Sequence, residues 1–169
     1  MAPEDAGRRH RQGLRPRPPP PTPGEALTDL LDTNVLSELR KGPRCDVHVA
    51  SWVSGVSDEE LCLSVLVVGE IRRGIEAVRR RDPRRAGTLE RWLVRLARDH
   101  ADRILPVDRA VAEEWGRLGA VRTVSVVDLL LAATARVHGL TLVTRNVRDV
   151  EWTGVPCLNP FVARSASER

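Results

Sequence analysis

Short apolar segments alternate with longer amphipathic segments along most of the chain, and no other feature constrains the fold as much. Apolar segments of strand length occupy 26–32, 60–64, 103–108, 140–144 and 155–159. Between them, apolar residues recur at helical spacing, which predicts helices at 34–42, 47–56, 65–80, 108–118 and 125–139, and one that begins at 82–83. Strands that alternate with helices favour an α/β fold, with a parallel central sheet and helices on both faces.

Composition divides the chain into a tail and a folded part. Residues 1–26 combine arginines with a proline run and have no periodic apolar positions, so they predict a disordered Arg/Pro-rich tail. A single domain is expected at 27–163, followed by a flexible C-terminus at 164–169. The tail has two interpretations, a basic arm that binds nucleic acid or a partner and a dispensable extension, of which we favour the second.

The charge balance is basic but not strongly so. There are 27 basic and 23 acidic residues, a net charge of +4, and Lys41 is the only lysine. Arginine suits phosphate contacts because its planar fork binds two oxygens at once. A GC-rich coding sequence produces the same arginine bias, so the charge is compatible with a polyanionic partner without demonstrating one.

Targeting signals and paired cysteines are missing from the sequence. No apolar stretch approaches the roughly 20 residues of a membrane span. The arginine-rich start has no apolar segment behind it, as a secretory signal would. Cys45, Cys62 and Cys157 are scattered and form no CxxC pair. A reduced, cytoplasmic protein without a zinc site and without membrane contact is therefore expected.

Acidic and amide side chains gather where predicted strands end. Asp32 ends the first strand, Glu70 and Asp128 lie in the first turns of two helices, and Asn146 and Asp149 follow the fourth strand. If these strands are neighbours, the side chains converge, and carboxylates that close repel one another unless a cation neutralises them. Oxygen ligands without Cys or His select Mg²⁺ or Mn²⁺. The chemistry that this pattern favours is hydrolysis of a phosphodiester by metal-activated water.

Each acid also has a purely structural interpretation. Asp32 can be the N-cap of the helix that follows it. Ser125 and Asp128 have the spacing of a capping box. Glu70 can pair with Arg73 three residues later. Apolar residues flank Asp32 and Asp128, where an unpaired charge is costly, so their shared position favours a functional site.

Four motifs together resemble those of PIN-domain ribonucleases, and among these most of all the VapC and FitB toxins of bacterial toxin–antitoxin pairs. In chain order they are "LLDTNVLSELRKG", "LSVLVVGEIRRGIE", "SVVDLLLAATARVHGLTLVTRN" and "VPCLNPF". The likeness covers residues 27–163. It implies a PIN-like fold, a parallel sheet with helices on both faces. It also implies a Mg²⁺- or Mn²⁺-dependent endoribonuclease that cuts RNA in an acidic pocket.

The resemblance also assigns roles to single residues. Asp32 matches the first acid of the family in "LDTN", Glu70 the second in "GEIRRG" and Asp128 the third in "VVDLLLAATA". By likeness, these three are the catalytic residues, which hold the metal and orient the attacking water.

Four further positions are expected to support the acids. Asn146 stands where some relatives carry a fourth aspartate, and Asp149 lies close enough in the sequence to replace it. Thr33 and Thr144 match small hydroxyl positions near the pocket, where they can hydrogen-bond the acids or an ordered water. The alternative is that both threonines only stabilise turns.

The expected partners also follow from the resemblance. They are an RNA substrate, a second copy of the chain in a homodimer, and a small antitoxin that blocks the pocket and binds operator DNA. Transfer, ribosomal and messenger RNA all present single-stranded loops to such a pocket. The alternative function is a catalytically weakened PIN domain that binds antitoxin or RNA without cutting. A haloacid-dehalogenase-type phosphatase is disfavoured because it needs an aspartate where this chain has Asn34.

Overall fold

A computed structural model describes residues 29–122 and 124–163 of the chain. The expectations for the tail at 1–26 and for the C-terminus at 164–169 lie outside the described residues. Within the described ranges, the element order matches the predicted alternation of strands and helices.

The centre of the described part is a sheet of five parallel strands. They are β1 (Asp29–Leu31), β2 (Leu61–Ser64), β3 (Ile104–Leu105), β4 (Thr141–Val143) and β5 (Cys157–Leu158). Their order in the sheet is β3-β2-β1-β4-β5, and each neighbouring pair is parallel. In β1, Leu30 lies between Cys62 of β2 and Leu142 of β4. The predicted parallel sheet is therefore confirmed.

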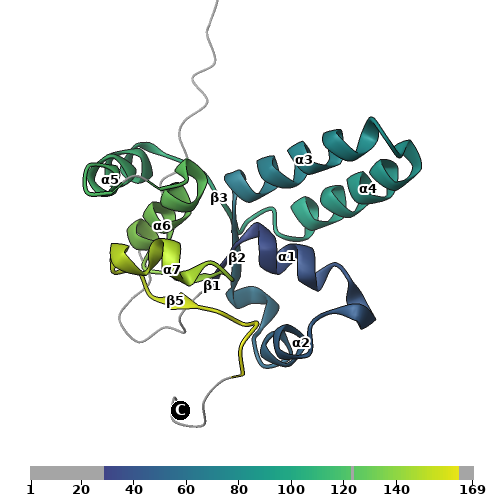
Figure 1. The fold of residues 1–169 in the computed structure, drawn as a ribbon, viewed down its shortest axis with the longest axis horizontal. Helices are drawn as coiled ribbons and strands as arrows, with labels where there is room; N and C mark the ends of the chain where they lie inside the picture. The colour runs from purple at the N-terminus through teal and green to yellow at the C-terminus, as the bar shows by residue number, and fades with distance from the viewer. Residues whose placement is uncertain (1–28, 123, 164–169) are drawn as a thin grey trace, which may run out of the picture.

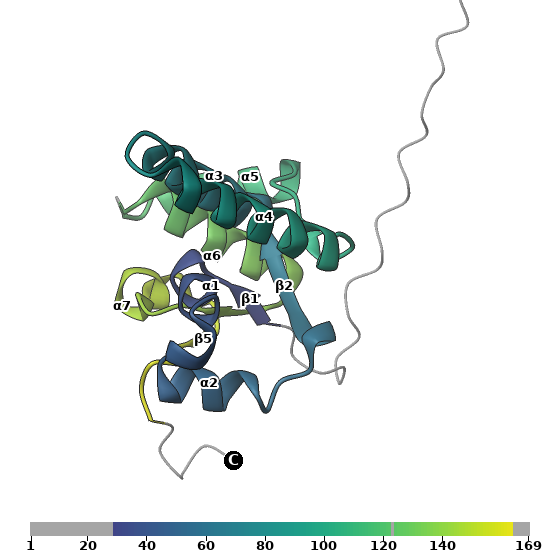
Figure 2. The same ribbon diagram turned by 90° about the vertical axis from the view of Figure 1, so that its right-hand side faces the viewer.

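Helices cover both faces of this sheet. Figure 1 shows one group on one side of the strands, consisting of α1 (Thr33–Leu39), α2 (Val47–Val53), α3 (Val65–Arg79) and α4 (Pro83–Asp99). The other group is α5 (Arg109–Gly119), α6 (Val126–His138) and the short α7 (Val147–Val150). In Figure 2, turned by 90°, α3 and α4 lie above the strands β1 and β2, and α2 lies below them. None of the described helices is both long and apolar enough to cross a membrane.

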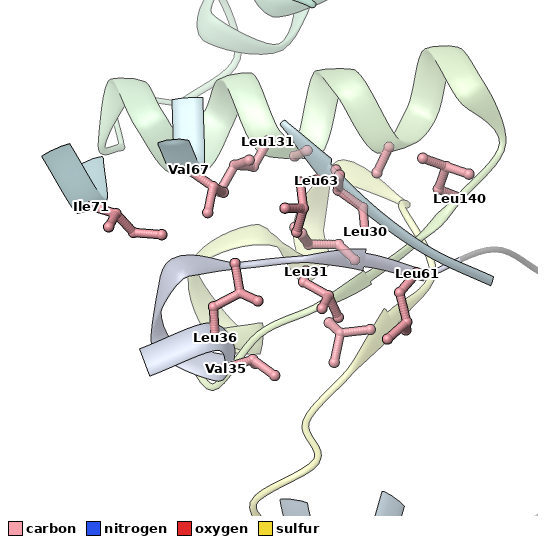
Figure 3. Packing of buried hydrophobic residues seen from close by; sticks show 14 of the residues in the cluster. Leu30, Leu31, Val35, Leu36, Leu61, Leu63, Val67, Ile71, Leu131 and Leu140 are labelled. Carbon is pink, nitrogen blue, oxygen red and sulfur yellow. The ribbon is translucent and has the colours of Figure 1, made fainter. Parts of the chain in front are cut away.

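The core forms because residues of a strand alternate between the two faces of the sheet. In β1, Leu30 points towards Leu131 of α6, whereas Leu31 points towards Leu36 of α1 (Figure 3). Leu30 and Leu31 are both almost fully buried, and Leu63 of β2 lies on the same side as Leu30. A near-continuous apolar run such as this one is what a parallel strand covered on both faces requires.

Two helix ends show how local sequence sets boundaries. Gly139 ends α6 as predicted, with a left-handed φ of +67° that favours glycine. The first helix ends at Leu39, three residues before the predicted stop at Gly42-Pro43. Gly42, with φ of +57°, instead opens a short 3₁₀ turn at Gly42–Arg44, with Pro43 as its second residue.

The strand order determines where a site can form. The chain passes from β1 through β2 to β3 and then returns to the other side of β1 as β4. In open parallel sheets, ligands bind beyond the carboxyl ends of the strands where the winding direction reverses. Here that point lies between β1 and β4, and Asp32 is the first residue after β1.

Candidate metal-binding site at the carboxyl ends of the strands

Asp32 occupies the N-cap position of α1, but its side chain does not cap the helix. Its backbone N–H donates to the Val143 carbonyl of β4 (3.0 Å), and its carbonyl accepts from the Leu36 N–H in the first turn of α1 (3.2 Å). The carboxylate itself makes no capping hydrogen bond. The capping interpretation of Asp32 therefore does not account for its side chain.

Two neutral side chains hold the Asp32 carboxylate. The Thr144 hydroxyl donates to Oδ2 at 2.6 Å, and Asn34 Nδ2 donates to the same oxygen at 2.6 Å. Asp32 is only 7% exposed. Burial raises the pKa of Asp32 above its ordinary value of 3.8, and the hydrogen bond from Thr144 partly offsets this effect. Burial therefore disfavours the charged form of Asp32, while the two hydrogen bonds hold its carboxylate in one orientation.

Glu70 is joined to the same region through Thr33. The Thr33 hydroxyl, at the start of α1, donates to Glu70 Oε2 in α3 at 2.6 Å. The ion pair predicted as the structural alternative is weak, because Arg73 Nη2 lies 3.9 Å from Glu70 Oε1 and the Arg73 side chain is 82% exposed. Thr33 thus links the helices that follow β1 and β2.

Asp128 lies in the first turn of α6, where the expected capping box is not formed. Ser125 is the N-cap residue, yet its side chain makes no capping hydrogen bond. Burial raises the pKa of Asp128 first, and the negative charge of Asp32 raises it further. Asp149 and Glu70 add smaller repulsions, and a hydrogen bond from Ser125 acts in the opposite direction.

This pattern of repulsion shows which residues the fold brings together. Electrostatic interaction weakens with distance, so carboxylates that raise the pKa of Asp128 lie near it. Asp32, Glu70 and Asp149 all do so, although they come from three different segments of the chain. The leading influences on the pKa of Asp32 and of Asp128 include no lysine or arginine. The negative charges of Asp32 and Asp128 therefore repel each other, and the cation nearest to the site's acids in the described residues is the exposed Arg73 beside Glu70.

Asn146 and Asp149 lie at the start of α7, a four-residue helix that the sequence pattern did not predict. Both are exposed. The backbone N–H of Asn146 donates to the Thr144 hydroxyl at 3.0 Å, which ties this turn to the Asp32 network. The Asn146 side chain does not cap α7. Of the two, only Asp149 contributes charge to the Asp128 environment.

Asn34 belongs to the hydrogen-bonded network around Asp32, although the sequence pattern did not single it out as a site residue. Besides donating to Asp32, its Nδ2 lies 3.2 Å from the Thr144 hydroxyl, and its Oδ1 accepts the backbone N–H of Arg145 at 3.1 Å. It therefore connects the segment after β1 to the segment after β4. Its position two residues after Asp32, in "DTN", was the available signal.

The carboxylates of the site can be compared with the ligands that the expected Mg²⁺ or Mn²⁺ prefers. Within residues 29–122 and 124–163, no three His, Cys, Asp or Glu side chains lie close enough to hold one ion together. Mg²⁺ does not need such a cage, because it keeps several waters and binds one or two carboxylates. Asp32 and Asp128 repel each other, and neither has a cation among its main influences, so their chemistry fits a hard divalent ion.

Comparison with known proteins agrees with this arrangement of acids on a parallel sheet. The PIN-domain model matches residues 30–150. The chain belongs to the PIN-domain family. The matched range contains Asp32, Glu70, Asp128, Asn146 and Asp149, and it includes β2, β3, β4 and all of β1 except its first residue.

Two curated PIN-domain relatives are named for their activity or role. Toxin FitB of Neisseria gonorrhoeae is 31% identical over 137 residues, which cover 78% of this chain and 97% of FitB. VapC ribonuclease Y4jK of Sinorhizobium fredii is 32% identical over 137 residues, covering 78% of this chain and 96% of the relative. The predicted likeness to VapC and FitB is therefore confirmed.

The fold is also that of a solved structure, FitAB bound to the IR36 DNA fragment. The two chains superpose with a TM-score of 0.73 and 27% identity, over 82% of this chain and 99% of the other. The PIN-like fold class expected from the sequence is confirmed by this superposition.

Proposed function

We propose that this PIN-domain protein is a metal-dependent endoribonuclease and the toxin of a type II toxin–antitoxin pair. The observation that carries the proposal is the hydrogen-bonded network at the reversal point of the sheet, in which Thr144 and Asn34 hold the Asp32 carboxylate and Thr33 holds Glu70. The names of the relatives support the reaction class, since one is a ribonuclease and another a toxin.

The catalytic residues that we propose are Asp32, Glu70 and Asp128, which would hold Mg²⁺ or Mn²⁺ either directly or through waters bound to the ion. When bound, such an ion supplies positive charge for the scissile phosphate and activates a water molecule for attack. Thr144 and Asn34 keep Asp32 oriented through the two 2.6 Å hydrogen bonds. Thr33 does the same for Glu70. We assign Asp149, rather than Asn146, as the fourth acidic position.

The test is RNA cleavage by the purified full-length protein with Mg²⁺, with Mn²⁺ and with EDTA. The substrate is a mixture of transfer, ribosomal and messenger RNA. Cleavage that needs the metal is expected to fall at least about 100-fold in Asp128→Asn, more than the loss typical of residues that only support metal ligands. The matched control is Glu59→Gln, an exposed acid outside the site that should cleave normally.

The outcome against the proposal is equally specific. A folded protein that neither cuts this mixture nor binds Mn²⁺ in calorimetry would overturn the nuclease assignment. It would favour the non-cutting PIN domain that binds antitoxin or RNA.

We further propose that the protein acts in the cytoplasm as a homodimer and is held inactive by a small DNA-binding antitoxin. The likeness to FitB and to the DNA-bound FitAB structure supports this assignment. Expression of the chain alone should arrest bacterial growth, and co-expression with the product of a small neighbouring gene should restore it. Growth arrest that persists in Asp128→Asn would contradict an RNA-cutting toxin.

A further inference from the structure

Helix α3 carries Glu70 and has three distinct faces. Its apolar face, with Val67, Ile71 and Ile75, is buried against the core. A second face pairs with α4, where the Glu90 carboxylate accepts from Arg72 at 2.6 Å and from Arg79 at 2.7 Å. Figure 1 shows α3 and α4 side by side, with the turn that joins them pointing away from the strands.

The third face of α3 is exposed and leads from the acidic site towards this turn. It contains Glu70, Arg73, Gly74, Ala77 and Arg80, whose spacing of three and four residues places them along one side of the helix. The ten residues from Glu70 to Arg80 correspond to about 15 Å along the helix axis. Gly74 and Ala77 have no bulky side chains on this exposed face, so another molecule can approach the helix backbone closely there.

Three arginines at the end of this path have no ion-pair partner among the described residues. Arg80, Arg81 and Arg85 line a hollow of about 490 Å³ between the end of α3 and the start of α4, which Asp82 also lines. None of them forms an ion pair within residues 29–122 and 124–163. The Asp82 carboxylate nearby accepts the backbone N–H of Arg85 at 2.9 Å and so caps α4.

Arg72 and Arg79, on the same helix, differ from this group because both are paired with acids. Glu76 and Glu90 each form ion pairs with both Arg72 and Arg79, with nitrogen–oxygen distances from 2.6 to 3.6 Å. Among the described residues, Asp82 is the one acid that lines the hollow of the three arginines, and it forms no ion pair with them. Three guanidinium groups beside a single carboxylate leave excess positive charge, and a phosphate chain offsets that charge with paired hydrogen bonds.

We propose that the RNA substrate lies along the exposed face of α3, with its backbone phosphates held by Arg80, Arg81 and Arg85. This inference rests on the proposed nuclease function. We favour RNA over operator DNA as the bound molecule because the exposed face of α3 leads to Glu70, one of the proposed catalytic residues. Contacts of this kind bind the sugar–phosphate backbone and position the strand, and they carry no base specificity.

The first test measures binding without cleavage. A labelled single-stranded RNA is titrated, in EDTA, with full-length Asp128→Asn protein that also carries Arg80→Gln, Arg81→Gln and Arg85→Gln. The matched control carries Arg44→Gln, Arg91→Gln and Arg95→Gln on the same background. These three arginines are also exposed and also lack an acidic partner among the described residues, so both variants lose the same charge.

The expected result is a difference in affinity and in salt dependence. Each lost phosphate contact lowers the slope of log affinity against log salt by about 0.7 for a single strand, so the turn variant should lose about 2 units. Its dissociation constant at low salt should rise at least about tenfold, and that of the control by less than about threefold. Equal behaviour of the two variants would overturn the inference. So would a loss of duplex-DNA binding with RNA binding unchanged.

The second test separates this inference from the nuclease assignment. Both triple variants are made with Asp128 intact and are assayed for RNA cleavage beside the wild type. Slower cleavage by the turn variant alone, reversed by raising the RNA concentration, is expected. Unaltered cleavage in the turn variant would refute the path along α3 and leave the nuclease assignment standing. A wild type that neither cleaves RNA nor binds Mn²⁺ would refute the nuclease, while the binding test still decides whether the turn holds RNA.

Discussion

Asp32 shows how a buried carboxylate can be kept available in a fold that otherwise disfavours it. Burial raises its pKa, while the donors on Thr144 and Asn34 stabilise the charged form and hold it in one orientation. Neither donor carries a charge. The negative charge is therefore positioned without being neutralised, as a cation-binding site requires.

Replacing Thr144 by valine tests this positioning role. Thr144 is 2% exposed, and valine has a similar shape without the hydroxyl. We expect Thr144→Val to lower the free energy of unfolding by about 1–3 kcal/mol. The reason is that Asn34 Nδ2 and the Asn146 N–H lose an acceptor, and the Asp32 carboxylate loses a donor. Cleavage should fall about 10- to 100-fold, the range for residues that orient metal ligands.

A matched control exists for this variant. Thr134 of α6 is fully buried, and its hydroxyl donates to the Leu130 carbonyl at 2.7 Å. Thr134→Val should keep full cleavage activity at a comparable stability, measured by urea unfolding. Equal loss of activity in both variants would mean that Thr144 acts only through stability.

The raised pKa values of Asp32 and Asp128 predict how metal-free stability depends on pH. A carboxyl whose pKa is raised in the folded state binds its proton more tightly there than in the unfolded chain. Between its ordinary pKa of 3.8 and the raised value, stability therefore falls as pH rises, and the full cost is present above that window.

Asp128→Asn removes one such group, so it should melt at a higher temperature than the wild type in EDTA. The difference should grow as pH rises from about 4 and then level off towards neutral pH. Other carboxyls act in the opposite direction, for example Glu38, whose pKa is lowered by its hydrogen bond with Lys41. The contribution of Asp128 is therefore given by the difference in melting temperature between the variant and the wild type. A melting-temperature difference that stays constant from acid to neutral pH would contradict the prediction.

At the scale of secondary structure, the position of α7 supports Asp149 over Asn146 as the proposed fourth acidic position. Its first turn carries Asp149, whose charge reaches Asp128, whereas the Asn146 side chain forms no hydrogen bond among the described residues. We expect Asp149→Asn to weaken Mn²⁺ binding several-fold, up to about tenfold. Asn146→Ala should change it little, and calorimetric titration with Mn²⁺ compares the two. The reverse order would identify Asn146 as the metal contact.

The strands and longer helices were predictable because their apolar residues repeat at a regular spacing over many positions. α6 is an example, with a strongly apolar pattern that ends at Gly139. α7 was not predictable, because four residues contain only one turn and no period can be recognised. The first helix was predicted too long because Gly42-Pro43 is a strong stop signal, while the chain leaves the helix at Leu39.

At the scale of the whole molecule, metal binding and folding stability should be coupled. The acids come from segments after β1, after β2, before β4 and after β4, so the unfolded chain has no equivalent site. Mn²⁺ should therefore raise the free energy of unfolding, by about 2.7 kcal/mol at a concentration one hundred times its dissociation constant.

Thermal unfolding with Mn²⁺ and with EDTA measures this effect. The stabilisation should be strongly reduced in Asp32→Asn and retained in Glu59→Gln, whose side chain lies outside the site. The same rise in melting temperature in all three proteins would show that Mn²⁺ binds elsewhere.

The sequence by itself determined the fold class and the identity of the candidate acids. Hydrophobic periodicity is a local property, and Asp32, Glu70 and Asp128 stand next to predicted strands or at helix starts. The tertiary structure decided the hydrogen-bonded network around these acids. Thr144 reaches Asp32 across 112 positions and Thr33 reaches Glu70 across 37, and such contacts depend on strand order, which no local pattern encodes. It also decided which arginines of α3 find an acidic partner among the described residues, because the pairing of Arg72 and Arg79 with Glu90 depends on how α3 packs against α4.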